Sequence, residues 1–229
     1  MEKPPVHAIY QCLRPECRLR FPILVTSRQR IKCPKCGSPT RLIATADISK
    51  INTTNHPLSS GVPLEALLDN IRSALNVGSI FRSADGAGVQ HLYLCGVTPA
   101  PGNTQIAKTA LGAEFAVHWS SHWDGVEIAS MLKGQGKKLW ALENTVGSQS
   151  IFEPFYEPDD RPIVLVIGNE VSGIDPGILQ QCDRTIHIPM LGAKKSLNVA
   201  IAFGVAIYLI RYLTSKQIHQ FSGADTSTS

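Results

Sequence analysis

Four cysteines near the N-terminus have the types and spacing of a metal site. Four residues separate Cys12 from Cys17, two separate Cys33 from Cys36, and 15 residues lie between the two pairs. Two close thiol pairs with a hairpin-length spacer can supply four thiolates to a tetrahedral Zn²⁺ ion. Gly37 follows the last thiol, where a tight knuckle turn needs a positive φ. The pattern therefore predicts a structural zinc site.

Disulfide pairing and four unrelated buried cysteines are the alternatives for this cluster. The paired spacing argues against unrelated cysteines, and the N-terminus argues against disulfides. Disulfides belong mainly to secreted chains, and Met1–Ala8 has no basic region followed by an apolar run, as a signal peptide would. Short strands are expected over Phe21–Thr26 and Gln29–Lys32. The whole arrangement resembles a zinc ribbon, with a first knuckle longer than usual. About 40 residues with few large apolar groups need such a metal to fold.

Positive charge is concentrated in the same segment. Residues 1–50 carry ten Lys/Arg and three Asp/Glu, a net charge of +7, whereas the remaining residues carry 12 and 15, a net charge of −3. A basic module on a near-neutral body suggests a polyanionic partner, and a solvated basic face is the alternative. The longest apolar run, Val199–Ile210, has 12 residues and is too short to cross a bilayer. We expect no membrane partner and a cytoplasmic setting.

Strand and helix patterns alternate from Pro63 onward and predict an α/β domain with a mainly parallel sheet covered on both faces. The predicted strands are Leu64–Leu68, His91–Leu94, Phe115–Trp119, Lys138–Leu142, Ile163–Ile167 and Thr185–Ile188. The predicted helices are Asn76–Gly86, Gln105–Leu111, His122–Lys133, Gly177–Cys182 and Leu197–Leu213. The expected organisation is a zinc-ribbon-like RNA-binding module over residues 1–46, a linker over 47–61, the α/β domain over 62–214 and a disordered tail over 215–229.

Three loops follow predicted strands at the edge of the sheet where ligands bind in such folds. The first opens a helix at Asn76 and contains Arg82. The second, Gly168–Ile174, has glycines that let its backbone approach a ligand closely. The third leads into the last helix, with Ser196 as the expected N-cap. Simple capping is the alternative role for Asn76 and Ser196, and a surface or interface charge is the alternative for Glu170.

In this order, the loops resemble the three motifs of the SpoU (TrmH-like) branch of the SPOUT RNA methyltransferases. The matching elements are Asn76-x-Gly78-x-Ile80-x-Arg82, Gly168-Asn169-Glu170-x-x-Gly173-Ile174, and Ile188-Pro189-Met190-x-Gly192-x-x-x-Ser196-Leu197-Asn198-Val199. The resemblance covers roughly residues 60–213, and its departures, Val171 and Ala200, replace no expected catalytic group. It implies a SPOUT-type fold with a C-terminal deep trefoil knot, and a homodimer with its active site near the subunit interface.

The resemblance also implies the reaction: transfer of a methyl group from S-adenosylmethionine to a ribose 2′-hydroxyl of tRNA or rRNA. Its implied catalytic residues are Arg82, Asn76, Glu170, Ser196 and Asn198. Because a guanidinium keeps its proton at neutral pH, we interpret Arg82 as a clamp on an RNA phosphate and not as a general base. The implied cofactor-binding residues are Leu142, Glu143, Asn144, Thr145, Gly168, Ile188, Met190 and Leu197.

Two other function classes remain open from the sequence. A non-catalytic RNA- or ribosome-binding protein could keep the same knotted fold, although the intact motifs argue against it. A nucleotide-dependent enzyme of the doubly wound class would need a phosphate-binding fingerprint, and none is present. The histidines without ligand spacing are expected to be structural or exposed, namely His91, His118, His122, His187 and His219.

Overall fold

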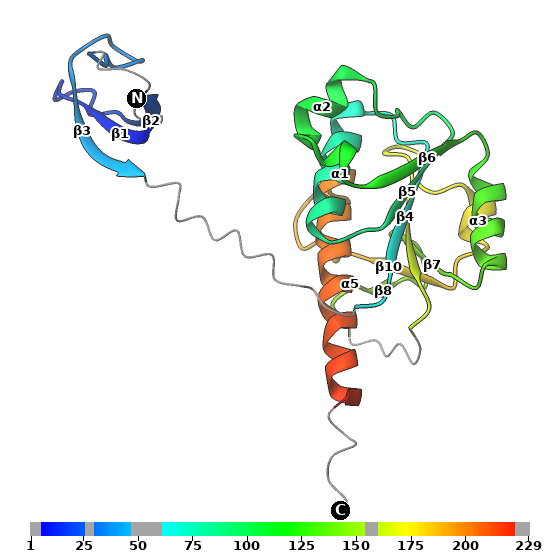
Figure 1. Cartoon of the computed structure of the whole chain (residues 1–229). Coiled ribbons are helices and arrows are strands. Elements are labelled where there is room, and N and C mark those ends of the chain that lie inside the picture. Colours follow the sequence, from blue (N-terminus) through cyan, green and yellow to red (C-terminus); the bar gives the residue numbers. More distant parts are fainter. Residues whose placement is uncertain (1–5, 26–29, 47–60, 154–159, 223–229) are drawn as a thin grey trace, which may run out of the picture. The chain divides into compact units, whose positions relative to one another are not determined.

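The computed structural model describes residues 6–25, 30–46, 61–153 and 160–222 of the chain. The chain divides into two compact units, Met1–Pro57 and Leu58–Ser229 (Figure 1). Residues 47–60 of the predicted linker lie outside the described residues, as do Thr26 and Gln29 at the ends of the predicted ribbon strands.

The N-terminal unit contains a three-stranded antiparallel sheet in the order β2-β1-β3. Its strands are β1 (Val6–Cys12), β2 (Arg20–Val25) and β3 (Thr40–Ala46). Only β2 agrees with a predicted strand. The second prediction, Gln29–Lys32, is wrong in its described part, where only Lys32 pairs, in an isolated bridge with Pro39. The chain enters the second cysteine knuckle at that point, and β3 forms only after the knuckle.

The main unit is built on a seven-stranded, wholly parallel sheet in the order β6-β5-β4-β9-β7-β10-β8. The strands are β4 (Leu64–Asp69), β5 (His91–Cys95), β6 (His118–His122), β7 (Lys138–Leu142), β8 (Gln149–Ser150), β9 (Ile163–Ile167) and β10 (Arg184–His187). The helices are α1 (Ala74–Gly86), α2 (Thr104–Ala110), α3 (Gly125–Gly134), α4 (Pro176–Leu179) and α5 (Val199–Ser222), with a 3₁₀ turn at Ala113–Phe115. The predicted mainly parallel α/β fold is confirmed.

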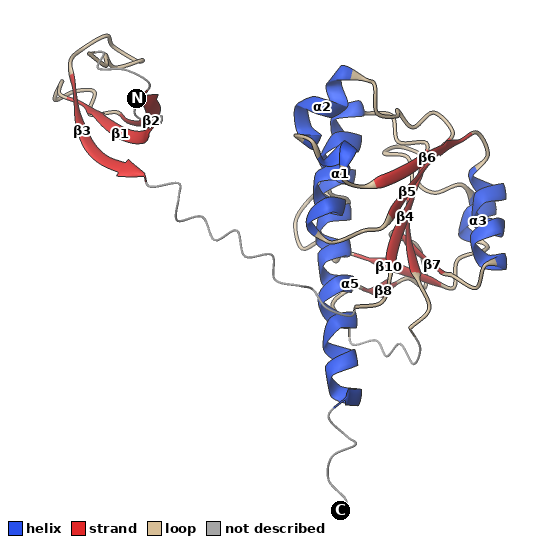
Figure 2. Cartoon of the chain, viewed as in Figure 1, coloured by secondary structure: helices blue, strands red, loops and turns tan. Residues whose placement is uncertain are grey.

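Helices cover the sheet on both sides (Figure 2). One buried cluster joins the sheet to α1 and α5, with Phe81 and Phe203 among its largest side chains. A second cluster joins the opposite face to α3 and α4. The central strand β9 is buried along its whole length, because both of its faces pack against helices. No helix in the described part of the chain has the length and apolar character needed to cross a bilayer.

The structure corrects two predicted elements. The predicted strand Phe115–Trp119 starts too early: Leu111 and Gly112 take φ values of 52° and 97°, Phe115 ends a 3₁₀ turn, and β6 covers only His118 and Trp119 of the predicted range. Helix α5 continues to Ser222, past its predicted end at Leu213, so the tail predicted from residue 215 starts too early. The reason is local, because the segment from Thr214 to Ser222 contains no Gly or Pro to end the helix.

Candidate functional site

A cavity of about 380 Å³ opens beyond the carboxyl ends of β7, β9 and β10. Its walls come from four segments of the chain: residues 142–144, residues 167–171 and 173, residues 187, 188 and 190, and residues 195–199 and 202. Ligand pockets for small molecules have volumes of roughly 300–1,000 Å³. The cavity therefore has the size and the position expected of a small-molecule site in a parallel α/β sheet.

A chain of hydrogen bonds joins the three loops that the sequence singles out. The Asn76 side-chain amide donates to Glu170 Oε1 over 3.1 Å, and the Asn198 amide donates to Asn76 Oδ1 over 3.1 Å. The Glu170 carboxylate also accepts the backbone N–H groups of Arg72 at 3.2 Å and Ser73 at 3.5 Å. Both ends of the Asn76 amide are thus in use, and Glu170 and Asn198 also line the cavity.

The Glu170 carboxylate is an anchor for the start of α1. Burial acts to raise the pKa of Glu170, but hydrogen bonds from its own backbone N–H, from Arg72 N–H and from the Asn76 amide outweigh it. The pKa of Glu170 therefore lies below its ordinary value. An ionised carboxylate beside the first turn of a helix also interacts favourably with the helix dipole.

The caps of the two helices differ from the predicted ones. Ser73, and not Asn76, caps α1, since Ser73 Oγ accepts the Asn76 N–H at 3.3 Å. Asn198, and not Ser196, caps α5, since Asn198 Oδ1 accepts the N–H groups of Ala200 at 3.0 Å and Ile201 at 3.4 Å. Asn198 therefore caps one helix and reaches the other at the same time, while Ser196 lies in the cavity wall.

The loop after β9 is folded tightly on itself. Asn169 N–H donates to Gly173 O at 2.9 Å, and Gly173 N–H donates back to Asn169 O at 3.0 Å. A Cβ on Gly168 would lie 2.3 Å from the Gly173 carbonyl carbon, so only glycine fits there. Gly78 of the first motif has a different role: a Cβ there would lie 2.3 Å from Ile106 O, so this glycine lets α1 and α2 pack closely.

Arg82 stands apart from this network. Its side chain is exposed on α1, it does not line the cavity, and within the described part of the chain its guanidinium forms no hydrogen bond or ion pair. Six residues of helix turn it roughly 120° away from Asn76. The structure therefore brings Asn76, Glu170, Ser196 and Asn198 to the cavity region and leaves Arg82 facing solvent.

The predicted cofactor-binding residues collect around the cavity. Seven of the eight line it, and the exception, Thr145, lies directly after Asn144 of the wall. His187 also lines the cavity, although its lack of ligand spacing in the sequence predicts only a structural or exposed role. Its place directly before Ile188 of the third motif was the only signal in the sequence.

The N-terminal cysteines form a compact cluster. The four Sγ atoms lie within 4.8 Å of one another, with Cys12 and Cys36 3.5 Å apart and Cys17 and Cys33 3.8 Å apart. Hydrogen bonds from the Ser38 side chain and backbone lower the pKa of Cys36 to about 6, whereas burial raises the pKa of Cys12 to about 12. Gly37 has a positive φ of 70°, as predicted, and Arg18 has a φ of 47° after the other cysteine pair.

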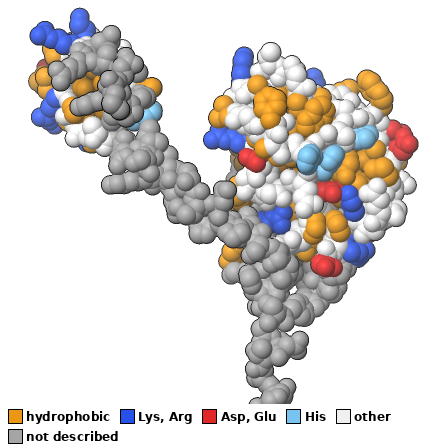
Figure 3. Space-filling view, viewed as in Figure 1, with side chains coloured by type: hydrophobic (Ala, Val, Ile, Leu, Met, Phe, Trp, Pro, Cys, Tyr) orange, Lys and Arg blue, Asp and Glu red, His pale blue; other side chains and the backbone are white. Residues whose placement is uncertain are grey.

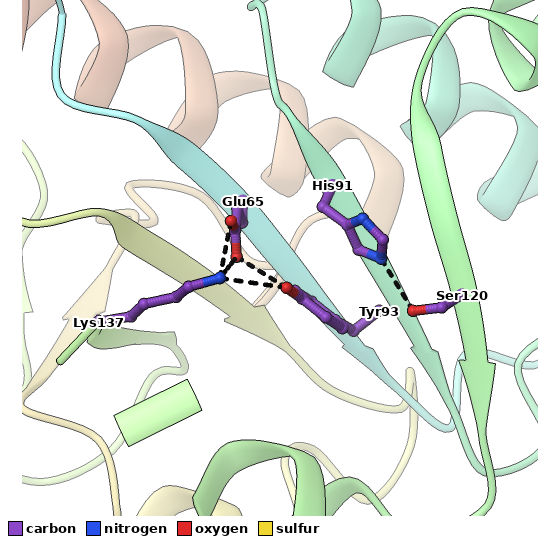
Figure 4. Close-up of polar contacts among 5 residues, drawn as sticks. All are labelled: Glu65, His91, Tyr93, Ser120 and Lys137. Atoms are coloured by element: carbon purple, nitrogen blue, oxygen red, sulfur yellow. Dashed lines mark hydrogen bonds and ion pairs between the residues drawn. The ribbon is translucent and has the colours of Figure 1, made fainter. Parts of the chain in front are cut away.

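A second polar cluster in the main unit lies on the sheet (Figure 4). Lys137 Nζ contacts both Glu65 carboxylate oxygens at 2.8 and 2.6 Å, and the Tyr93 hydroxyl donates to Glu65 Oε2 at 3.0 Å. His91 Nε2 lies 2.8 Å from Ser120 Oγ. Histidine side chains reach the surface of this unit beside hydrophobic and charged ones (Figure 3). None of these residues lines the cavity, and their polar groups satisfy one another, so the cluster ties neighbouring strands together.

The chain is similar in sequence to known RNA methyltransferases. Three relatives are the 23S rRNA (guanosine(2553)-2′-O)-methyltransferase RlmP of Bacillus subtilis, the 23S rRNA (guanosine-2′-O-)-methyltransferase RlmB of Pseudomonas aeruginosa and the tRNA (guanosine(18)-2′-O)-methyltransferase of Aquifex aeolicus. They are 30%, 33% and 30% identical over 147, 153 and 146 residues, which cover 63%, 66% and 61% of this chain. The chain spans 56%, 60% and 64% of their lengths, in each case less than two thirds.

Solved structures agree with these relatives. An AdoMet-bound rRNA methyltransferase from Sinorhizobium meliloti has a TM-score of 0.61 at 27% identity, covering 67% of this chain and 57% of its own. The TrmH/SpoU tRNA-modifying enzyme of A. aeolicus has a TM-score of 0.58 at 25% identity, covering 73% and 91%. The family described as SpoU rRNA Methylase matches residues 63–208, a range that contains the cavity walls and the Glu170–Asn76–Asn198 network. The chain therefore belongs to the SpoU rRNA methylase family.

Proposed function

We propose that this chain is an S-adenosylmethionine-dependent RNA methyltransferase that modifies a ribose 2′-hydroxyl of tRNA or rRNA in the cytoplasm. The observation that carries the proposal is the hydrogen-bonded chain from Glu170 through Asn76 to Asn198 at the cavity. Relatives named as 2′-O-methyltransferases of both 23S rRNA and tRNA support the reaction type. The two kinds of relative leave the choice between tRNA and rRNA open.

The cavity walls fit the chemistry of S-adenosylmethionine, which supplies an electrophilic methyl group when bound. Leu142, Ile188 and Leu197 offer apolar contacts for an adenine ring. Glu143 and Asn144 offer polar groups for its hydrophilic parts, and Glu143 is itself held by the Ile174 N–H at 3.1 Å. Gly168 lets the loop after β9 fold close enough to line the cavity, because a side chain there would meet the Gly173 backbone.

We assign Arg82 to the RNA. Its permanently charged guanidinium can hold the phosphate next to the target ribose and stabilise negative charge that develops on the 2′-oxygen. Asn76, Glu170 and Asn198 fix the first turn of α1, the helix that carries Arg82, and Ser196 in the cavity wall helps position the ribose. The exposure of Arg82 supports this role, because a phosphate must reach it from solvent.

We further propose that the protein is a homodimer with its active site near the subunit interface. Helix α5 buries one face in the core, yet its other face also carries apolar side chains. These side chains are 36–57% exposed: Ile201, Val205, Tyr208 and Tyr212. An exposed apolar stripe of this kind suits contact with a second copy of the chain. The trefoil knot implied by the family resemblance stays a prediction.

For the N-terminal unit we propose a zinc ribbon over residues 1–46, followed by a linker, that binds one structural Zn²⁺ and the RNA backbone. Zn–S bonds of about 2.3 Å in a tetrahedron place sulfurs about 3.8 Å apart. The spacings of 3.5 and 3.8 Å in the cluster are close to that value. The net charge of +7 over residues 1–50 suits RNA phosphates, so binding should weaken as salt increases.

The test is incubation of the purified chain with labelled S-adenosylmethionine and total cellular RNA, followed by nucleoside analysis. We expect label in a 2′-O-methylated nucleoside, and none with Arg82→Ala, while that variant still binds the cofactor. Label that persists with Arg82→Ala would contradict the assigned role of Arg82. Absence of both label and cofactor binding in the wild type would favour the alternative, a non-catalytic RNA- or ribosome-binding protein.

A further inference from the structure

His187 lies in the cavity wall, and one of its ring nitrogens is hydrogen-bonded to another residue of the protein. It is the last residue of β10, it is half-buried, and it lines the cavity. Its Nδ1 lies 2.9 Å from Ser148 Oγ. Among the described residues, none forms a hydrogen bond with its Nε2, so that nitrogen is available to a ligand.

The hydroxyl of Ser148 decides which nitrogen carries the proton. Ser148 Oγ donates to Thr145 O over 2.7 Å, and a hydroxyl has only one hydrogen to donate. Ser148 Oγ must therefore accept its second hydrogen bond from the Nδ1–H of His187. In a neutral imidazole that tautomer leaves Nε2 as an acceptor with a free lone pair.

The surrounding backbone holds this ring in place. Ser148 N–H donates to Thr145 O at 3.1 Å and closes the turn that carries the hydroxyl. His187 pairs with Ser150 of β8, and its carbonyl accepts the Ile151 N–H at 2.8 Å. Both partners of the ring contact are thus fixed to the same pair of strands. The acceptor is preorganised before any ligand arrives.

We propose that His187 is a cofactor-binding residue whose Nε2 accepts a hydrogen bond from an N–H or O–H group of bound S-adenosylmethionine. This inference rests on the proposed function. The adenosine part of the cofactor offers amino and hydroxyl donors, which match an acceptor.

Two near-isosteric variants separate the roles of the two ring nitrogens. His187→Asn keeps a donor near the Nδ1 position for Ser148 and has no atom at the Nε2 position. His187→Gln places an amide oxygen near the Nε2 position. Calorimetric titration of the full chain with S-adenosylmethionine should show affinity about three- to tenfold weaker for His187→Asn and within about twofold of wild type for His187→Gln. His118→Asn, an exposed position on β6 outside the cavity, is the matched control and should leave affinity unchanged.

A second measurement needs no cofactor. Long-range ¹H–¹⁵N correlation spectra of the free, ¹⁵N-labelled chain report the tautomer, and the His187 signals are assigned by their loss in His187→Gln. We expect the Nδ1–H form, and a protonated Nε2 in the neutral ring would overturn the inference. If the wild type binds S-adenosylmethionine and His187→Asn binds it with the same affinity, the inference is overturned as well. A wild-type chain that binds no S-adenosylmethionine would instead refute the proposed function, and the cofactor role of His187 with it.

Discussion

The Asn76–Glu170 contact can be tested by changing a single atom type. In Asn76→Asp, an oxygen replaces the amide nitrogen that donates to Glu170 Oε1 over 3.1 Å. The acceptor that receives the Asn198 amide stays in place. The substitution therefore turns an attraction into a repulsion without changing the shape of the side chain.

The expected cost follows from the geometry. A hydrogen bond to a charged group contributes about 1.5–3 kcal/mol, and exposure of the Glu170 side chain puts this one at the low end. Two charges at this distance in a water-like dielectric repel by about 1.3 kcal/mol. A new carboxylate in the first turn of α1 recovers about 0.5 kcal/mol from the helix dipole. We expect Asn76→Asp to lower the free energy of unfolding by about 2 kcal/mol at neutral pH.

Urea unfolding followed by tryptophan fluorescence measures this change in the main unit alone, because Trp119, Trp123 and Trp140 all lie there. The deficit should shrink below about pH 5, because one carboxyl of the pair then binds a proton and can donate to the other. In Asn76→Ala, which adds no charge, the loss at neutral pH should be smaller, and it should shrink less in acid because only the Asn76 hydrogen bond to the ionised Glu170 is lost from the wild type. An Asn76→Asp protein as stable as wild type at pH 7.5, or with a deficit that ignores pH, would refute the reasoning.

Three further predictions concern other parts of the molecule. We expect wild-type protein to contain one zinc ion per chain by elemental analysis, and Cys33→Ser to contain none. Unfolding of the main unit, followed by tryptophan fluorescence, should be the same in both proteins. Wild-type protein purified without zinc would contradict the proposed zinc ribbon. Gly168→Ala should weaken S-adenosylmethionine binding at least about tenfold, since its methyl group would meet the Gly173 backbone at 2.3 Å; unchanged affinity would show that the loop relaxes freely. Burial lowers the pKa of His91 in the folded state, so the stability present above the ordinary histidine pKa of about 6.5 should be lost as the pH falls below it. His91→Gln should flatten that part of the pH profile measured by urea unfolding, with the exposed His118→Gln as control, and a profile unchanged in His91→Gln would exclude His91 as its source.

The sequence by itself determined most strands of the main unit. Lys138–Leu142 and Ile163–Ile167 were predicted with the bounds that the structure has, since short, largely apolar runs between turn signals are a local property. β8 has only two residues and carries no periodic pattern, so it could not be predicted. The end of α5 was missed because the segment after Leu213 has no Gly or Pro to end the helix and no clear apolar period to extend the prediction.

The residue types of the site were also evident from the sequence, because each motif is a short continuous segment. Their meeting is a tertiary property: Glu170 is 94 residues from Asn76 in the chain, and Asn198 is 122 residues from it. Sequence reasoning placed the α1 and α5 caps at the wrong residues, because Ser and Asn lie close together at both helix starts and either type can cap.

For His187 and Arg82, the tertiary structure determines what each side chain contacts. The tautomer of His187 depends on Ser148, which is 39 residues away and reaches the ring only because β8 pairs with β10. Arg82 belongs to a motif by sequence, yet the helical rotation of α1 turns it away from Asn76 and into solvent. Local sequence therefore determined which chemical groups the protein has. Strand pairing and helix rotation decided which of them meet, because those contacts form only when distant segments pack together.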